Sequence, residues 1–382
     1  MTPTPDSDPL KGPSPTRVCH VVCYQDTSYV RTTSLARALD SIPSVTYIPA
    51  RNRHPNLFRY PETLLRVLLS RITKRPDVYI LGFRGHEMFP FIRLLTVGRP
   101  LIFDAFMSPT LALSEDKKHG RLGKHVARLV RPMERFALRF SDNCITDTEA
   151  HRSAIAEAFS LSERDFSVVH VGADPTTASS FRTEVDSKVF QQDTSVSPLK
   201  VLFYGSFLPL HGAPFILDAF RMLEGHNIAL TLIGGGKHAK GLLRKYADQF
   251  DPELIRHIDW VPKKQLVEEF IPRADVCLGG PFGLSRQAER IVTGKTIQCL
   301  SQSKPVIIGK NACSEAFKDK LNCIAIPRGN AKALAQALLW ASENQDELSS
   351  IGAQGAALFT ELFSTEAIAK QLRWAIEAVE EL

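Results

Sequence analysis

Long apolar segments are absent from this 382-residue sequence, although 44% of its residues are hydrophobic. No run approaches the roughly 18 to 20 apolar residues that a membrane-spanning helix needs. The first 16 residues contain five prolines and no aromatic residue, and they lack the basic-then-apolar order of a signal peptide. We therefore expect a disordered tail over residues 1–16 and a cytoplasmic location.

Metal-binding patterns are also scarce. The seven cysteines are an odd number and lie mostly in apolar, strand-like segments, which favours buried thiols over a disulfide framework. Cys19 and Cys23 have no second Cys or His pair at zinc spacing. Outside the predicted tail, no DxD-type metal motif is evident. We therefore predict neither a metal site nor a bound cofactor.

Two common nucleotide motifs are incomplete. Gly234, Gly235 and Gly236 follow a predicted strand, but they lack GxGxxG spacing and the later acidic residue that would hold a ribose. Two interpretations of these glycines remain open: a loop that approaches a phosphate group, and a turn without a ligand. Lys295 follows a glycine, as in a P-loop, but the first glycine of that motif is replaced by Glu289. The sequence therefore excludes a P-loop.

Predicted strands and helices alternate through both halves of the chain. The expected strands are 18–24, 45–48, 78–82, 100–103, 144–146, 168–171, 200–204, 228–233, 255–260, 274–278 and 306–308. The expected helices include 32–39, 61–73, 149–159, 214–223, 242–249, 264–270, 331–342 and 365–382, and residues 117–139 are predicted to be helical on either side of Pro132. This alternation predicts an α/β protein with two Rossmann-like, doubly wound domains.

The domain boundary is predicted from composition. Residues 176–198 are polar, weakly periodic and rich in Ser, Thr and Asp, which is typical of a linker. The predicted units are thus a first domain over residues 17–175, the linker over 176–198, and a second domain over 199–362, followed by a helix at 363–382.

The segment 274–309 carries the strongest candidate site. A short buried strand ends in a glycine-rich loop, and a helix is predicted to begin at Gly294 with Lys295 and Gln298 three residues apart on one face. Free N–H groups at a helix start and nearby cations, including Arg290, suit phosphate oxygens. A solvated basic loop is the alternative interpretation.

A second loop contributes to the same prediction. Gly205 and Gly212 bracket the sequence SFLPLH between a strand and a helix, which is long enough to fold over a diphosphate. Ser206 and His211 lie within this loop. We include Gly205, Ser206, Gly212, Gly234 and Gly235 among the residues predicted to approach a phosphate or diphosphate group.

Two residues of the first half are candidates for catalysis. His86 ends the loop after strand 78–82, where a general base or an oxyanion partner would lie. Its unperturbed pKa lies near neutrality, which suits proton transfer. Asp104 ends the next strand, and a buried Asp that caps residues 105 and 106 is the alternative there.

Positive charge is concentrated in the first half. Residues 1–175 contain 24 Lys and Arg against 18 Asp and Glu, whereas residues 176–382 contain 23 of each. The basic segments 51–75 and 117–139 also carry apolar faces, so they are either solvated surfaces or an interface to an anionic membrane. Aromatic residues do not interleave with the charges, so we predict no nucleic-acid partner.

Several of these segments resemble a known family. RIVTGKTIQCLSQSKPVI, from Arg290, resembles the donor-binding signature of glycosyltransferase family 4, in the divergent branch with Lys-x-x-Gln at the donor-site helix. VLFYGSFLPLHG, FDAFMS, CITDTEAHRSAIAEAF and VVHVGAD resemble further segments of that branch. The resemblance extends from about residue 17 to the C-terminus.

The resemblance implies a GT-B fold, in which the last helix returns to the first domain and the two domains face each other across a cleft. It implies transfer of a sugar from a nucleotide-diphosphate donor to an acceptor hydroxyl, with retention and without a metal. The acceptor, a sugar or lipid-linked glycan, would bind the first domain, so the protein would be cytoplasmic or peripheral at the inner membrane face.

The resemblance also implies residue roles. Asp104 occupies a position where much of the family has a His facing the reacting sugar, and Glu315 resembles an acidic residue near the donor sugar. The usual Arg and Lys of the diphosphate clamp are Ser206 and His211 here, and the usual Glu pair is Arg290 and Gln298. An epimerase or phosphorylase of the same fold and a non-catalytic nucleotide-sugar-binding protein remain alternatives.

Overall fold

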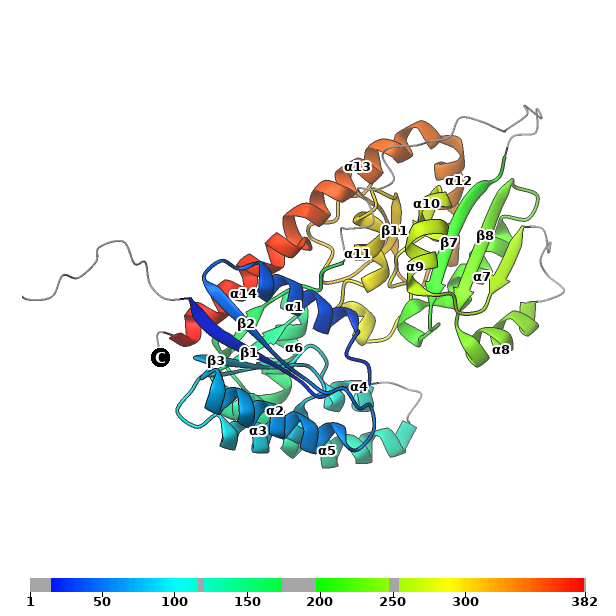
Figure 1. The fold of residues 1–382 in the computed structure, drawn as a ribbon. Coiled ribbons are helices and arrows are strands. Elements are labelled where there is room, and N and C mark those ends of the chain that lie inside the picture. Colours follow the sequence, from blue (N-terminus) through cyan, green and yellow to red (C-terminus); the bar gives the residue numbers. More distant parts are fainter. Residues whose placement is uncertain (1–14, 116–119, 174–196, 247–253, 381–382) are drawn as a thin grey trace, which may run out of the picture.

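Two parallel β-sheets organise the chain in the computed structural model, which describes residues 15–115, 120–173, 197–246 and 254–380 (Figure 1). The predicted tail and most of the predicted linker lie outside these ranges, as do residues 116–119 of the basic segment and the end of the helix predicted at 242–249. Within the described ranges, no helix is both long and apolar enough to cross a membrane.

The first sheet has the strand order β2-β1-β3-β4-β5-β6. Its strands are β1 (Thr16–Val22), β2 (Val45–Arg51), β3 (Val78–Leu81), β4 (Leu101–Asp104), β5 (Asn143–Thr146) and β6 (Phe166–Val168). Its helices are α1 (Val30–Ser41), α2 (Arg59–Thr73), α3 (Phe89–Leu95), α4 (Pro109–Glu115), α5 (Gly120–Phe140) and α6 (Glu149–Phe159), with a short 3-10 turn, η1 (His86–Met88).

The second sheet has the order β12-β11-β10-β7-β8-β9. Its strands are β7 (Leu199–Gly205), β8 (Ile228–Gly234), β9 (Ile255–Ile258), β10 (Val276–Leu278), β11 (Val306–Lys310) and β12 (Ile324–Pro327). The helices are η5 (Pro209–His211), α7 (Ala213–Met222), α8 (Gly236–Tyr246), α9 (Lys263–Gln265), η7 (Leu266–Phe270), α10 (Ile271–Arg273), η8 (Gln287–Glu289), α11 (Gly294–Leu300), α12 (Ala331–Glu343), α13 (Gln345–Leu362) and α14 (Thr365–Glu380).

The central strands are buried on both faces, which is why they are continuous apolar runs. All four residues of β3 (VYIL) and of β4 (LIFD) are buried, and every strand pair is parallel. Helices therefore cover both faces of each sheet, as a parallel sheet requires. The predicted fold class, two doubly wound α/β domains, is confirmed.

The last helix packs on the first domain rather than on the second. Figure 1 shows α13 beside the second sheet and α14 continuing from it to the first. Leu372 and Ile376 of α14 are buried against Leu35 of α1 and Ile145 of β5. The main-chain N–H of His170 also donates to Gln371 Oε1 at 2.8 Å. The end of the chain is thus part of the core of the first domain.

Some elements differ from the sequence predictions. The helix α5 runs without interruption through Pro132, which is exposed. The helices α4 and α13 and the strand β12 were not predicted. Gly352 and Gly355 weaken the helical signal of α13, yet a Cβ at Gly352 would lie 2.2 Å from Ser303 O. These glycines therefore let α13 lie close to the turn after α11.

We predict that Leu372→Ala destabilises the protein by about 2 to 5 kcal/mol, because Leu372 is fully buried and truncation leaves a cavity. The matched control is Trp374→Ala on the same helix, where the side chain is 59% exposed, and its effect should stay within about 0.5 kcal/mol. Urea unfolding of both variants, followed by circular dichroism, measures the difference. Equal losses would contradict the packing of α14 described above.

Candidate active site

The strand order of the second sheet reverses between β7 and β10, and in open α/β sheets ligands bind outside the carboxyl ends of such strands. We call this position the crevice. The chain passes from β7 to β8 on one side of β7, whereas β10 pairs with β7 on the other side. The loops after β7 and β10 therefore leave the sheet in different directions. These are the two loops predicted from the sequence. They touch at their far ends, where Gly283 N–H donates to Leu210 O at 3.0 Å and Gly212 leaves no room for a Cβ beside Gly283.

Lys295 extends from α11 to this crevice. A Cβ at Gly205 would lie 3.6 Å from Lys295 Nζ and 3.3 Å from His211 Cε1, and Nζ lies 5.4 Å from the centre of the Phe203 ring. Burial lowers the pKa of Lys295 to about 7. No described carboxylate lies within 4.0 Å of the ammonium group, which thus has no countercharge in this part of the chain. An anion would neutralise this charge.

His211 is uncharged at neutral pH. Its Nδ1 accepts a hydrogen bond from Leu208 N–H at 3.2 Å, which fixes the ring in the loop. Burial, with a further contribution from Lys295, lowers its pKa to about 3. A neutral imidazole adds no positive charge to the crevice, so Lys295 is the cation that defines it.

The glycines after β8 allow a second close approach. Gly234 and Gly235 have φ angles of +97° and +76°, and a Cβ at Gly234 would lie 2.5 Å from Gly205 O. Gly235 N–H donates to the same carbonyl at 2.7 Å. The loops after β7 and β8 therefore meet beside Lys295, and Ser206 begins the first of them.

The base of α11 is held against β10. Thr293 caps the helix by accepting from Thr296 N–H at 3.2 Å, and its hydroxyl donates to Gly279 O at 2.7 Å. Gly279 lies so close to α11 that a Cβ would be 2.4 Å from Thr296 Oγ1. This contact sets the position of the helix that carries Lys295.

Arg290 faces the first domain rather than Lys295. Its guanidinium contacts Glu115 of α4 at 3.0 Å, and its carbonyl accepts from Thr148 at 2.5 Å. Arg286 lies 3.8 Å from the same carboxylate. Both contacts to Arg290 connect the two domains at this point.

A cavity of about 210 Å³ lies between the domains beside this ion pair. Its lining includes Met107, Glu115 and His151 from the first domain and Leu208, Arg286 and Arg290 from the second. The lining is mixed apolar and charged. A sugar ring presents both apolar faces and hydroxyl groups, so the cavity suits such a ligand.

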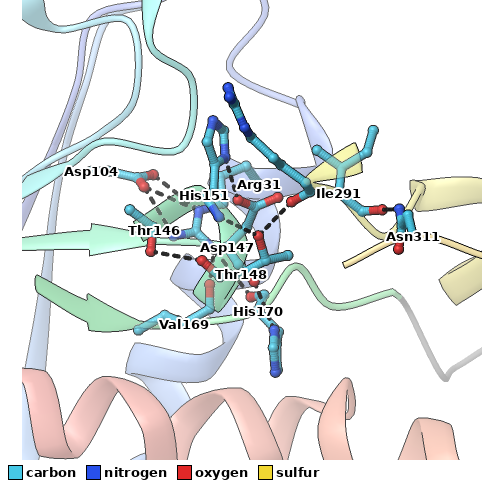
Figure 2. Close-up of polar contacts among 11 residues, drawn as sticks. Arg31, Asp104, Thr146, Asp147, Thr148, His151, Val169, His170, Ile291 and Asn311 are labelled. Carbon is cyan, nitrogen blue, oxygen red and sulfur yellow. Dashed lines mark hydrogen bonds and ion pairs between the residues drawn. The ribbon is translucent and has the colours of Figure 1, made fainter. Parts of the chain in front are cut away.

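An Asp–His pair lies at the first-domain side of this cavity. Asp147, directly after β5, is 2.8 Å from His151 Nδ1, and both side chains are buried (Figure 2). Asp147 O also lies 2.7 Å from His170 Nδ1. With Nδ1 engaged by the carboxylate, Nε2 of His151 is the nitrogen available for a ligand in the cavity. The pair is thus an oriented imidazole that can accept or donate a proton.

Asp104 is held in a buried ion pair. Arg31 of α1 contacts it through Nε and Nη2, the closest distance being 2.9 Å, and Arg31 Nη1 also donates to the carbonyls of Val169 and His170 (Figure 2). Burial raises the pKa of Asp104, and the guanidinium of Arg31 opposes that shift. The carboxylate connects β4 with α1 and does not line the cavity. Its predicted catalytic role stays a prediction.

His86 lies in the apolar layer beneath the first sheet. Its ring packs edge-to-face on Phe103 at 4.9 Å between ring centres, and burial lowers its pKa to about 4. Nε2 has no hydrogen-bond partner among the described residues. His86 follows β3 next to the point where the strand order of the sheet reverses, but it does not line the cavity.

The remaining predicted residues are dispersed. Gln298 lies on α11, and its side-chain amide donates to Ser301 at 3.3 Å. Glu315 lines a different interdomain cavity, of about 150 Å³, together with Glu149 and His170. The structure thus gathers Gly205, Ser206, Gly212, Gly234, Gly235 and Lys295, and it separates Arg290 and Glu315 from them.

Sequence reasoning missed four polar residues: Arg31, which pairs with Asp104, Glu115, which lines the cavity, and the pair of Asp147 and His151, of which His151 lines the cavity. The last two had a usable signal, because an Asp and a His four residues apart directly after a buried strand lie on one side of a helix start. Glu115 had none, since its role depends on an arginine 175 residues away.

The second domain matches a known family in sequence. Residues 198–344 match the family model described as Glycosyl transferases group 1, and this range extends from β7 to the end of α12. The second half of the chain therefore contains a glycosyltransferase group 1 domain. A comparison with curated proteins finds no significant match.

Solved structures resemble the whole chain. The Anabaena protein HepE in complex with UDP-glucose has 13% identity and a TM-score of 0.68, covering 96% of this chain and 100% of HepE. Sucrose-phosphate synthase from Thermosynechococcus elongatus has 12% identity and a TM-score of 0.69, covering 96% and 99%. The lipopolysaccharide outer core galactosyltransferase WaaB in its apo form has 12% identity and a TM-score of 0.59, covering 96% and 100%. The shared fold is the GT-B fold of two facing domains.

We predict that Gly279→Ala destabilises the protein by about 1 to 3 kcal/mol, because the added Cβ collides with Thr296 and Val306. Gly294→Ala is the matched control at the first residue of α11, where no atom lies within 4 Å of the new Cβ. It should leave stability unchanged or raise it by up to about 1 kcal/mol. Thermal unfolding of both variants tests the close contact, and equal melting temperatures would rule it out.

Proposed function

We propose that the protein is a glycosyltransferase that moves a sugar from a nucleotide-diphosphate donor to an acceptor hydroxyl. The observation that carries this proposal is the buried ammonium of Lys295, without a described countercharge, at the crevice of a glycosyltransferase group 1 domain. A diphosphate supplies the missing negative charge. The glycine loops after β7 and β8 meet beside it.

Related folds support this choice of ligand. HepE was crystallised with UDP-glucose and with UDP and glucose, and TarM of S. aureus was crystallised with UDP and sugar ligands. The identity to these proteins is only 12 to 13%, so the sugar and the base are not transferred from them.

In the proposed reaction, Lys295 offsets the charge that develops on the departing diphosphate. A preorganised cation in a desolvated site stabilises such charge more than water does. Arg290 supplies a second cation when the donor phosphate replaces Glu115 as its partner. Positive side chains thus take the part that a divalent metal has in other transferases, and the proposal includes a metal-independent reaction.

On the acceptor side, we propose that His151 contacts the attacking hydroxyl in the interdomain cavity. Asp147 is then a positioning residue that fixes the imidazole with Nε2 toward the ligand. Asp104 and His86 act at a distance in this scheme, since neither lines the cavity. Asp104 positions Arg31, which in turn donates to the main-chain carbonyl of Val169 after β6. His86 packs on Phe103 and so supports the end of β4.

The finer parts of the proposal follow the sequence resemblance: retention at the anomeric carbon, an acceptor in glycan, glycolipid or polysaccharide assembly, and Gln298 and Glu315 at the donor ribose and sugar. Proton NMR of the first-formed product reads its anomeric configuration. Activity that persists in EDTA supports the metal-independent reaction.

The decisive experiment is an assay of nucleoside-diphosphate release over a panel of UDP-, GDP- and ADP-sugars with sugar and lipid-linked acceptors. Acceptor-dependent release is the expected result. Epimerisation or phosphorolysis without an acceptor would replace the proposal with one of those activities. Tight binding without turnover over the whole panel would identify a non-catalytic binding protein.

We predict that UDP binding weakens as pH rises above 7, by up to tenfold per pH unit. The pKa of Lys295 in the free protein is about 7, so the protein loses this cation over that range, while binding of the anion requires the charged form. Lys295→Met should weaken binding at pH 7 by roughly 10- to 100-fold and abolish the pH dependence. Calorimetry between pH 7 and 9 measures both effects.

Uridine is the control ligand for this prediction, because it lacks the phosphates. Its affinity should change with neither pH nor the Lys295→Met substitution. A wild-type affinity for UDP that is constant from pH 7 to 9 would remove Lys295 from the donor site.

We predict that His151→Ala lowers kcat by roughly 10²- to 10⁴-fold with little change in donor affinity, because general acid–base groups contribute at that scale. Asp147→Asn should give a smaller fall. Added imidazole should partly restore the His151→Ala variant, which a purely structural role would not allow. His86→Ala is the comparison variant: if it loses as much activity as His151→Ala and imidazole restores neither, the cavity is not where the proton transfer occurs.

A further inference from the structure

The helix α5 has its apolar side chains in an unusual arrangement. The residues that it buries include the small ones, Gly123, Ala127 and Ala137, whereas Leu122 and Leu129 are 75% and 79% exposed. An amphipathic helix on a protein surface normally buries its large apolar residues. Here large apolar side chains with helical spacing are exposed to solvent: Leu122, Val126, Leu129, Phe136 and Phe140.

The neighbouring helices extend this surface. Figure 1 shows α2, α3 and α5 together on one side of the first sheet, opposite α1 and α14. Ile72 of α2 and Leu94 of α3 are 62% and 73% exposed. Of the 20 exposed large apolar side chains in the described ranges, 14 lie on or next to these three helices. We call the outer surface of α2, α3 and α5 the apolar–basic face.

Cations flank the apolar side chains on this face. The described part of α5 exposes Lys124, Arg128, Arg135 and Arg139, and its single carboxylate, Glu134, is buried and accepts from Thr110 N–H. At the end of α2, Lys74 and Arg75 are exposed as well. A patch that is both apolar and positive favours a partner with an apolar interior and a negative surface.

We propose that the apolar–basic face docks on a membrane surface that contains anionic phospholipids. Leu122, Leu129 and Phe136 would enter the boundary between headgroups and acyl chains, and the flanking Lys and Arg would lie at the phosphate level. This proposal goes beyond the proposed function. Only its consequence rests on that function: a lipid-linked acceptor would reach the first domain from the membrane.

Charge favours lipid over a second copy of the chain. A two-fold contact would place the face against itself, so the cations of one α5 would meet those of the other. The described part of α5 exposes no carboxylate that would offset them. Anionic headgroups neutralise the same cations, and each Lys or Arg near such a surface strengthens binding by roughly fivefold.

The layer order also fits the cavity. The helix α4, which carries Glu115, packs against α5, so the cavity lies next to the docking face rather than on the far side of the molecule. The second domain carries no comparable stripe in the described ranges, where its exposed large apolar residues are isolated ones such as Met222 and Leu321. The donor crevice would thus remain open to water.

The experiment is flotation of the full-length protein with vesicles of phosphatidylcholine alone or with one quarter phosphatidylglycerol. We expect binding to the anionic vesicles and little to the neutral ones. Replacing Lys124, Arg128 and Arg135 by Gln should weaken binding roughly a hundredfold. Leu122→Ser with Leu129→Ser should also release the protein, without loss of stability because both side chains are exposed.

A matched control removes the same charge elsewhere: Lys200, Lys263 and Lys332 to Gln, all exposed on the second domain. This triple variant should float like the wild type. Salt should release the wild type, since the Debye length falls from about 8 Å at 0.15 M to about 3 Å at 1 M. Equal binding to both kinds of vesicle, or equal loss in both triple variants, would overturn the proposal.

Light scattering in solution tests whether the face instead joins two copies of the chain. A wild-type dimer that Leu122→Ser and Leu129→Ser convert to a monomer, without vesicle binding, would identify the face as an interface between copies and overturn the proposal. Vesicle binding does not depend on turnover, so flotation distinguishes a failure of this proposal from a failure of the proposed transferase activity.

Discussion

The ammonium group of Lys295 is buried without a described countercharge, and the function proposed for the second domain depends on that charge. Its pKa of about 7, against 10.5 in an exposed lysine, corresponds to roughly 5 kcal/mol of unfavourable free energy for the charged form. The folded protein binds fewer protons at this site than the unfolded chain between these pH values. This cost is thus complete below pH 7 and decreases as pH rises toward 10.5. An anion bound to Lys295 removes the cost at neutral pH.

The contrast with Arg31 separates a structural charge from a functional one. Arg31 is as deeply buried, but a carboxylate and two main-chain carbonyls occupy its guanidinium, so it needs no ligand. Removing one partner of such a pair typically costs about 3 to 5 kcal/mol. Arg31 therefore fixes the carboxyl edge of the first sheet. At the carboxyl edge of the second sheet, Lys295 has no such partner, so a negatively charged ligand could bind there.

The alternation of strands and helices was predictable because parallel strands are continuous apolar runs, as in β3 and β4. The loops after β7 and β8 were predictable as well, since Gly205, Gly212 and Gly234 mark turns after such strands. Contacts between distant segments were not. Glu115 meets Arg290 only after two domains have folded, and no local pattern contains that pairing. The helix α13 was missed for a related reason: its glycines lower helix propensity, and the packing that favours them is non-local.

Arg290 contacts the first domain through two groups that would respond differently to a ligand. Its carbonyl accepts a hydrogen bond from Thr148, and this contact does not involve the Arg290 side chain. Its guanidinium pairs with Glu115. A phosphate group could replace this carboxylate, because a guanidinium forms bidentate hydrogen bonds with either anion. Such an exchange would leave Glu115 with the longer contact to Arg286, at 3.8 Å, and Glu115 belongs to α4, which packs directly on α5. In the proposed function, binding of the donor is thereby coupled to the part of the first domain that receives the acceptor.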